Sequence, residues 1–228
     1  HVWFPTGFNA YQLGTDWSVN VGCGAQVDLD DYFSRLPPRS LTRFNVFAQF
    51  AVNKQSGLVD FGPLDRVFAT AKRHNQMVLP VLAGGSGDCE NGKFKERGWY
   101  VDGWRTIRDL GGMIYAGWMS SAVTRWRDES TIAGWELVGE PEPSRCGDAA
   151  CTWQTRTCPA DAAAVLTDFF DAAGDRLRAL DPHRPIFAGL TGGDQCGING
   201  ADYATVGASR GIDVLDFHDY GIDASHRT

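Results

Sequence analysis

The chain has 228 residues, 43% hydrophobic and 21% charged, which is typical of a globular protein and enough for one domain with a sizeable core. Lysine and arginine total 21 against 28 aspartate and glutamate residues, and the formal net charge of -7 argues against nucleic acid or an anionic membrane surface as the partner. No apolar run approaches the ~20 residues of a membrane span, so we expect no membrane partner.

Segments with strand and helix character alternate along the chain. The predicted strands are residues 7–13, 41–50, 77–83, 132–138, 186–190 and 214–220, and the predicted helices are residues 28–36, 62–74, 104–126, 160–180 and 201–208. Such alternation predicts a parallel sheet, either doubly wound or closed as a barrel. No glycine-rich phosphate-binding motif follows the first strand, which argues against a nucleotide-binding protein.

Two of the predicted strands have one polar face. The residues that share this face are Arg43, Asn45 and Gln49 in the second strand and Asp216, His218 and Tyr220 in the sixth. A doubly wound sheet buries both faces and has little use for polar rows, whereas a barrel has an interior and a rim where they converge. We therefore favour the α/β class with a TIM-type (β/α)8 barrel, of which residues 1–228 supply about six β/α units in a single domain.

Six cysteines fall in predicted loops, at Cys23, Cys89, Cys146, Cys151, Cys158 and Cys196. None forms a C-x-x-C pair, which argues against a zinc ribbon or a thioredoxin-like protein. We expect neither a metal nor a cofactor. Disulfides in these loops would indicate an oxidising compartment, so we expect a protein that is secreted (extracellular) or located in the cell envelope. Free thiols in a cytosolic enzyme are the less favoured alternative, and the pairing stays open.

Charged and polar residues stand at the ends of three predicted strands. Glu140 leaves the fourth strand where Pro141 ends it, His218 and Tyr220 end the sixth, and Arg43 lies on the second. Active sites of β/α barrels lie at the carboxyl ends of the strands. A carboxyl group, an imidazole, a phenol and a guanidinium around one rim therefore form a candidate active site.

These motifs resemble the clan A glycoside hydrolases, most closely family five, the cellulase and β-mannanase family. The resemblance is carried by W-E-L-x-x-E-P over residues 135–141, by H-x-Y over residues 218–220 and by the opening G-x-N-x-Y-x-L over residues 7–13. It runs from residue 7 to residue 220. It implies a retaining hydrolase on a (β/α)8 barrel that cleaves a β-linked polysaccharide or oligosaccharide of the mannan or glucan type.

The resemblance assigns a role to each site residue. Glu140 matches the acid/base, His218 and Tyr220 match the pair that lines the catalytic subsite, and Arg43 matches the arginine that orients the nucleophile. Gly139 departs from the family, which has an asparagine here whose amide binds the sugar 2-hydroxyl. Tryptophans on the loops are candidate sugar platforms, namely Trp17, Trp99 and Trp153.

The nucleophile has no counterpart in the sequence, because the family takes it from a seventh strand. Glu136 lies roughly 13 Å below Glu140 at ~3.3 Å per residue, which is too far for it to act as the nucleophile. We therefore interpret it as a buried carboxylate that needs a basic or hydrogen-bonding partner. Glu142 is expected to be solvated. We expect a C-terminal continuation or a second chain to complete the barrel. The alternatives are a catalytically impaired carbohydrate-binding barrel and a doubly wound protein with another function.

Overall fold

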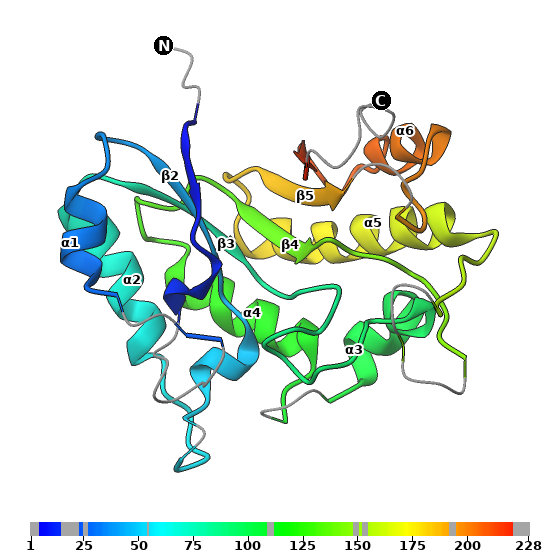
Figure 1. Cartoon of the computed structure of the whole chain (residues 1–228), viewed down its shortest axis with the longest axis horizontal. Helices are drawn as coiled ribbons and strands as arrows, with labels where there is room; N and C mark the ends of the chain where they lie inside the picture. Colours follow the sequence, from blue (N-terminus) through cyan, green and yellow to red (C-terminus); the bar gives the residue numbers. More distant parts are fainter. Residues whose placement is uncertain are drawn as a thin grey trace.

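The structure, a computed structural model, describes residues 5–14, 23–24, 27–53, 55–108, 112–147, 151, 155–191 and 195–220. Its strands are β1 (Gly7–Asn9), β2 (Leu41–Asn45), β3 (Met77–Val81), β4 (Trp135–Gly139), β5 (Ile186–Thr191) and β6 (Val214–His218). They form one parallel sheet in chain order, β1-β2-β3-β4-β5-β6. The sheet curls into the partial β/α barrel that the sequence predicts (Figure 1).

The helices lie between consecutive strands in the chain. They are α1 (Leu29–Ser34), α2 (Gly62–Arg73), α3 (Trp104–Thr106), α4 (Tyr115–Trp126), α5 (Ala162–Leu180) and α6 (Ala201–Gly207). Asp28 caps the first turn of α1, because its side chain accepts hydrogen bonds from the amides of Asp30 and Asp31. Figure 1 shows the helices following one another around the sheet, from α1 and α2 at one end to α6 at the other. None of the described helices is long and apolar enough to cross a membrane.

Several predicted elements are shorter or interrupted; the third strand ends at Val81 and the sixth at His218. The first strand ends at Asn9 and the chain then turns through a 3-10 helix, Tyr11–Gly14, which buries Leu13. The second ends at Asn45, and Gln49 lies buried in the following 3-10 turn rather than on the Arg43 face. The prediction of a single helix over residues 104–126 is wrong. It is divided into α3 and α4 by a segment in which Gly112 has a φ of 72°.

The core lies between the sheet and its helices, and β4 is buried along its whole length. Within it, Trp118 Nε1 donates to the carbonyl of Val46 at 3.0 Å, whereas the buried indole nitrogens of Trp99 and Trp104 have no hydrogen-bond partner among the described residues. Trp99 is only 6% exposed and packs against Tyr115 and Phe169, so its prediction as a sugar platform is wrong. The other two tryptophans proposed for that role, at positions 17 and 153, lie outside the described residues.

Helix α5 and the segment before β6 approach each other closely at two glycines. A Cβ atom on Gly174 would lie 2.1 Å from the carbonyl oxygen of Gly211. A Cβ atom on Gly211 would lie 1.8 Å from the carbonyl oxygen of Phe170. Side chains at these two positions would therefore force the helix away from the sheet.

All six cysteines form disulfides, as predicted: Cys23–Cys89, Cys146–Cys151 and Cys158–Cys196. The last bridge joins the loop after β4 to the loop after β5. The first reaches the loop after β3. All three bridges therefore involve loops at the carboxyl ends of central strands, where the candidate site residues also lie.

Candidate active site

Glu140 follows β4 directly and has a left-handed backbone, with a φ of 53°. Its amide donates to the carbonyl of Gly189 at 2.8 Å, and its carbonyl accepts from Gln195 Nε2 at 3.4 Å. A glutamate with a positive φ is uncommon and costs on the order of 1–3 kcal/mol, so the surrounding structure must hold it. The backbone of Gly85, in the loop after β3, fits against this turn, because a Cβ there would lie 2.1 Å from the Glu140 carbonyl oxygen.

The carboxylate of Glu140 is held by His218, the last residue of β6, and by Tyr220, two residues after the strand. His218 Nδ1 lies 2.8 Å from Glu140 Oε1, and the Tyr220 hydroxyl donates to the same oxygen. Burial raises the pKa of Glu140, but these two hydrogen bonds and the positive charges of His218 and Arg43 together outweigh burial, so the net pKa lies below its usual value. In this arrangement the carboxylate is stabilised in its ionised form.

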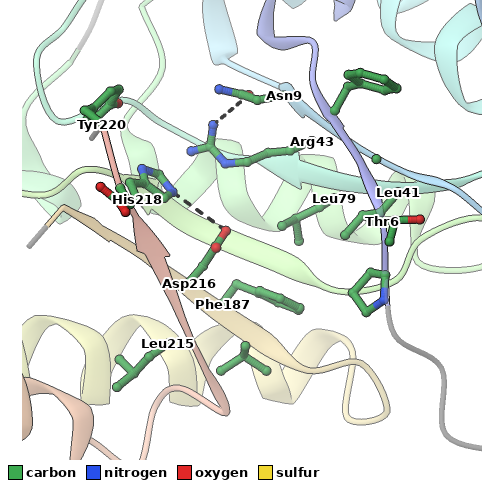
Figure 2. Close-up of a pocket in the computed structure, with 15 residues that line it drawn as sticks. Thr6, Asn9, Leu41, Arg43, Leu79, Phe187, Leu215, Asp216, His218 and Tyr220 are labelled. Atoms are coloured by element: carbon green, nitrogen blue, oxygen red, sulfur yellow. Dashed lines mark hydrogen bonds and ion pairs between the residues drawn. The ribbon is translucent and has the colours of Figure 1, made fainter. Parts of the chain in front are cut away.

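His218 lies between two carboxylates. Its Nε2 is 3.7 Å from Asp216 Oδ2, an ion-pair distance rather than a hydrogen bond (Figure 2). Its Nδ1 faces Glu140. Burial lowers the pKa of His218, but the carboxylates of Asp216 and Glu140 raise it more, to about 9. The imidazole is therefore a cation at neutral pH.

Arg43 pairs with Glu136 deep in the sheet. Its Nε and Nη2 donate to the two carboxylate oxygens, each at 2.7 Å, and Nη1 donates to Asn9 Oδ1 at 3.1 Å (Figure 2). Glu136 has no exposed surface, and the bidentate contact supplies the basic partner that its burial requires. The expectation of a partnered, buried Glu136 is confirmed, and both its oxygens are occupied.

Two glycines make room for these charged groups. A Cβ on Gly139 would lie 2.7 Å from Arg43 Nη2, and one on Gly189 would lie 2.1 Å from Glu136 Oε1 and 2.9 Å from His218 Nε2. Glycine at position 139 is therefore explained by the space that the Arg43–Glu136 pair occupies. The same close approach also makes Glu136 and His218 neighbours across β5.

The expectation that Glu142 is solvated is wrong. It is 4% exposed, and its carboxylate accepts from Arg156 Nε at 2.7 Å and from the amide of Cys196 at 3.3 Å. Pro141 turns the chain back into the protein after Glu140, so the next glutamate enters the interior. Burial raises the pKa of Glu142, and the Arg156 guanidinium opposes that rise.

Two clefts open beside the network. One, of about 430 Å³, lies among the carboxyl ends of the strands and is lined by Asn9, Arg43, Gly139, Glu140 and Tyr220 together with loop residues. The other, of about 490 Å³, runs along the concave side of the sheet between β1 and β6 (Figure 2). The first cleft gives an extended polar ligand access to Glu140.

The five predicted site residues are thus brought together: Arg43, Gly139, Glu140 and Tyr220 line the first cleft, and His218 lines the second and contacts Glu140. Sequence reasoning missed the contributions of Asn9, Asp216, Gly189 and Glu142. The polar face of the sixth strand signals Asp216, and the opening motif contains Asn9. Nothing in the sequence signals the space that Gly189 leaves. Among the described residues, no group of three or more His, Cys, Asp or Glu side chains is arranged to hold a metal ion.

No model of a known protein family matches the chain. It is 28% identical over 173 residues to a protein of Aspergillus terreus named "Probable mannan endo-1,4-beta-mannosidase C". That match covers 71% of this chain but only 42% of the other protein, so the chain spans less than half the length of this relative.

Solved structures share the fold. The endo-1,4-β-mannanase from Rhizomucor miehei superposes with a TM-score of 0.62 at 17% identity, over 95% of this chain and 67% of that one. A glycoside hydrolase family 5 mannosidase from the same organism gives a TM-score of 0.54 at 14% identity, over 92% of this chain and 56% of that one. The resemblance to family five that the sequence motifs carry is thereby confirmed, and the fold is that of a partial β/α barrel.

Proposed function

We propose that this chain carries most of the catalytic domain of a retaining β-glycoside hydrolase, with Glu140 as its acid/base. The observation that carries the proposal is the placement of Glu140. It stands at the carboxyl end of β4, beside a cleft of about 430 Å³, with His218 and Tyr220 bonded to its carboxylate. This is the rim at which β/α barrels perform their chemistry.

In the proposed reaction, Glu140 donates its proton to the departing glycosidic oxygen. A second carboxylate attacks the anomeric carbon as that C–O bond breaks, which leaves the sugar covalently bound to the enzyme. Water then attacks the same carbon and gives its proton to Glu140, and the second carboxylate leaves. Both enzyme groups return to their starting states.

The second carboxylate must lie about 5–5.5 Å from the first in a retaining enzyme. The buried glutamates nearest Glu140 in the chain do not fit this role, because Glu136 is bound to Arg43 and Glu142 to Arg156. We propose that the nucleophile stands on further strands that close the sheet between β6 and β1, each of which has one strand neighbour among the described residues. A C-terminal continuation or a second chain would supply them.

Such a carboxylate would change the titration of Glu140. His218 and Tyr220 lower the pKa of Glu140, which favours the ionised form needed to accept a proton from water. A like charge about 5 Å away raises a carboxyl pKa and so favours the protonated form needed to release the leaving group. We propose that loss of this negative charge when the covalent intermediate forms switches Glu140 from acid to base.

The proposed substrate is a β-linked polysaccharide of the mannan or glucan type. Mannan is the first choice, because the curated relative is named as a mannan endo-1,4-β-mannosidase and the solved structures include mannanases. The three disulfides favour a secreted protein. The formal net charge of -7 suits an uncharged sugar substrate better than a polyanion.

The test is hydrolysis by the full-length protein, measured as reducing ends released from β-mannan and β-glucan. Glu140→Gln removes the proton donor and should abolish release. Glu129→Gln changes a glutamate paired with Lys72 before β4 begins, away from the cleft, and should leave release unchanged. A retaining enzyme forms the β-anomer first, which proton NMR of the early product detects.

A second candidate, a carbohydrate-binding barrel without turnover, is favoured by one observation. The pKa of Glu140 is lowered in the described structure, which suits a proton donor poorly. Binding of mannan oligosaccharides without hydrolysis, unaffected by Glu140→Gln, would support this candidate and exclude the enzyme.

A further inference from the structure

The buried ion pair Glu142–Arg156 lies directly behind Glu140. The carboxylate receives two donors from one guanidinium, from Arg156 Nε at 2.7 Å and from Nη2 at 2.6 Å. The side chains are 5% and 12% exposed, so water screens the pair weakly. Neither residue contacts the cleft beside Glu140.

Glu142 joins elements from three different parts of the chain. Its amide donates to the Tyr100 hydroxyl at 3.1 Å, and its carboxylate also accepts from the amide of Cys196, in the loop after β5. Arg156 comes from the loop between β4 and α5, and its guanidinium stacks 4.9 Å above the ring of Phe94, in the loop after β3. One ion pair therefore ties together the loops that follow β3, β4 and β5.

This junction is connected to Glu140 along two routes. Along the chain, Pro141 alone separates the two glutamates, and its ring restricts the backbone between them. Through space, Gln195 adjoins the junction at Cys196 and donates to the carbonyl of Glu140 at 3.4 Å. The left-handed backbone of Glu140 needs surrounding contacts to hold it in that conformation. The junction around Glu142 supplies buried contacts on the side of Glu140 away from the cleft.

We propose that Glu142 and Arg156 are positioning residues that hold the Glu140 carboxylate at the hydrogen-bonding distance from His218 and Tyr220 and thereby set its catalytic efficiency. The inference rests on the proposed function and deepens it. Neither residue touches the substrate in this account. They act through the backbone of residues 140–142 and through the loops on either side.

The first test uses Glu142→Gln in the full-length protein, assayed on β-mannan where circular dichroism shows it folded. A displacement of a reacting group by about 1 Å costs on the order of 100-fold in rate. We expect kcat to fall about 10- to 100-fold with KM within about twofold, because the substrate contacts remain. Arg156→Lys, which keeps the charge but loses the planar fork, should give a smaller fall.

The matched control is Asp181→Asn. Asp181 is also buried and paired, with Arg184 at 2.8 Å and with Trp135 Nε1 at 2.9 Å, but it lies at the end of α5 before β5 begins. This variant should lose thermal stability and keep its kcat. The double variant Glu142→Met, Arg156→Met should regain stability without regaining kcat. Native kcat in Glu142→Gln, or in the double variant, would overturn the proposal.

A measurement without substrate separates this inference from the proposed function. The carboxylates of Asp216 and Glu140 together raise the pKa of the His218 imidazole to about 9, and its NMR signal is assigned by its loss in His218→Asn. In Glu142→Gln the pKa should fall toward the usual value of about 6.5, while Asp181→Asn should leave it in place. An unchanged pKa would overturn the positioning role even if the protein proves inactive on every polysaccharide.

Discussion

At the residue scale, Gly139 determines how closely Arg43 can approach the end of β4. An asparagine at this position matches the family pattern, but its Cβ would lie 2.7 Å from Arg43 Nη2. That nitrogen is already fixed by its hydrogen bond to Glu136 at 2.7 Å. We expect Gly139→Asn to displace Arg43 and to lower both stability, by about 1–3 kcal/mol, and activity. Urea unfolding and kcat on β-mannan check this, and a rise in kcat would contradict it.

The charge on His218 makes stability depend on pH. Its pKa is about 9 in the folded protein and about 6.5 when unfolded, so the folded state binds the proton more tightly. The resulting stabilisation is fully present below pH ~6.5 and is lost as the pH rises through ~9. His218→Asn should therefore lose less stability than the unsubstituted protein across this interval, measured as the free energy of unfolding in urea. Parallel losses in the two proteins would contradict the assignment.

At the scale of elements, the contact between α5 and the segment before β6 depends on two glycines. Gly→Ala inside a helix usually stabilises by roughly 0.5–1 kcal/mol. At Gly174 the sign should reverse, because the new Cβ would lie 2.1 Å from the Gly211 carbonyl oxygen. We expect Gly174→Ala to destabilise by about 1–3 kcal/mol. Gly117→Ala in α4, where the new Cβ would meet nothing within 4 Å beyond its chain neighbours and its own helix backbone, is the control and should stabilise.

The type of element, helix or strand, was predictable from the sequence wherever the apolar residues follow a clear pattern along the chain. The apolar spacing of α5 and the doubly apolar β3 are correctly predicted, because packing against the sheet imposes those periods. Element ends were less predictable. The residues after β1 and β2 keep their apolar character while the backbone turns into 3-10 helix, so composition does not mark the change.

The candidate site was partly predictable for a related reason. The positions of Arg43, Glu140 and His218 along their strands, and the alternation of side chains between the two faces, predicted that they share one rim. This was possible because alternation along a strand is a local property. The burial of Glu142 was not predictable, because it depends on Arg156 and on a loop more than fifty residues along the chain. The direction of the Glu140 pKa likewise follows from contacts that only the folded sheet creates.

At the scale of the whole molecule, the disulfides should differ in what they contribute. The bridge Cys23–Cys89 spans 66 residues, Cys158–Cys196 spans 38 and Cys146–Cys151 spans 5. Loop-closure entropy predicts about 4 kcal/mol for each of the two long bridges and about 2 kcal/mol for the short one. Paired Cys→Ser variants should therefore lower the melting temperature least for Cys146–Cys151. Equal losses for all three bridges would contradict this order.

The strand order β1-β2-β3-β4-β5-β6 also determines when the chemistry can appear during synthesis. Each strand pairs with the one made just before it, so the sheet can grow as the chain leaves the ribosome. Glu140 emerges with β4, yet His218 and Tyr220 arrive some eighty residues later. Until then the nascent chain holds a carboxylate without its cationic neighbour. Acquisition of that neighbour marks the completion of β6 and would serve as a natural reporter of how far folding has advanced.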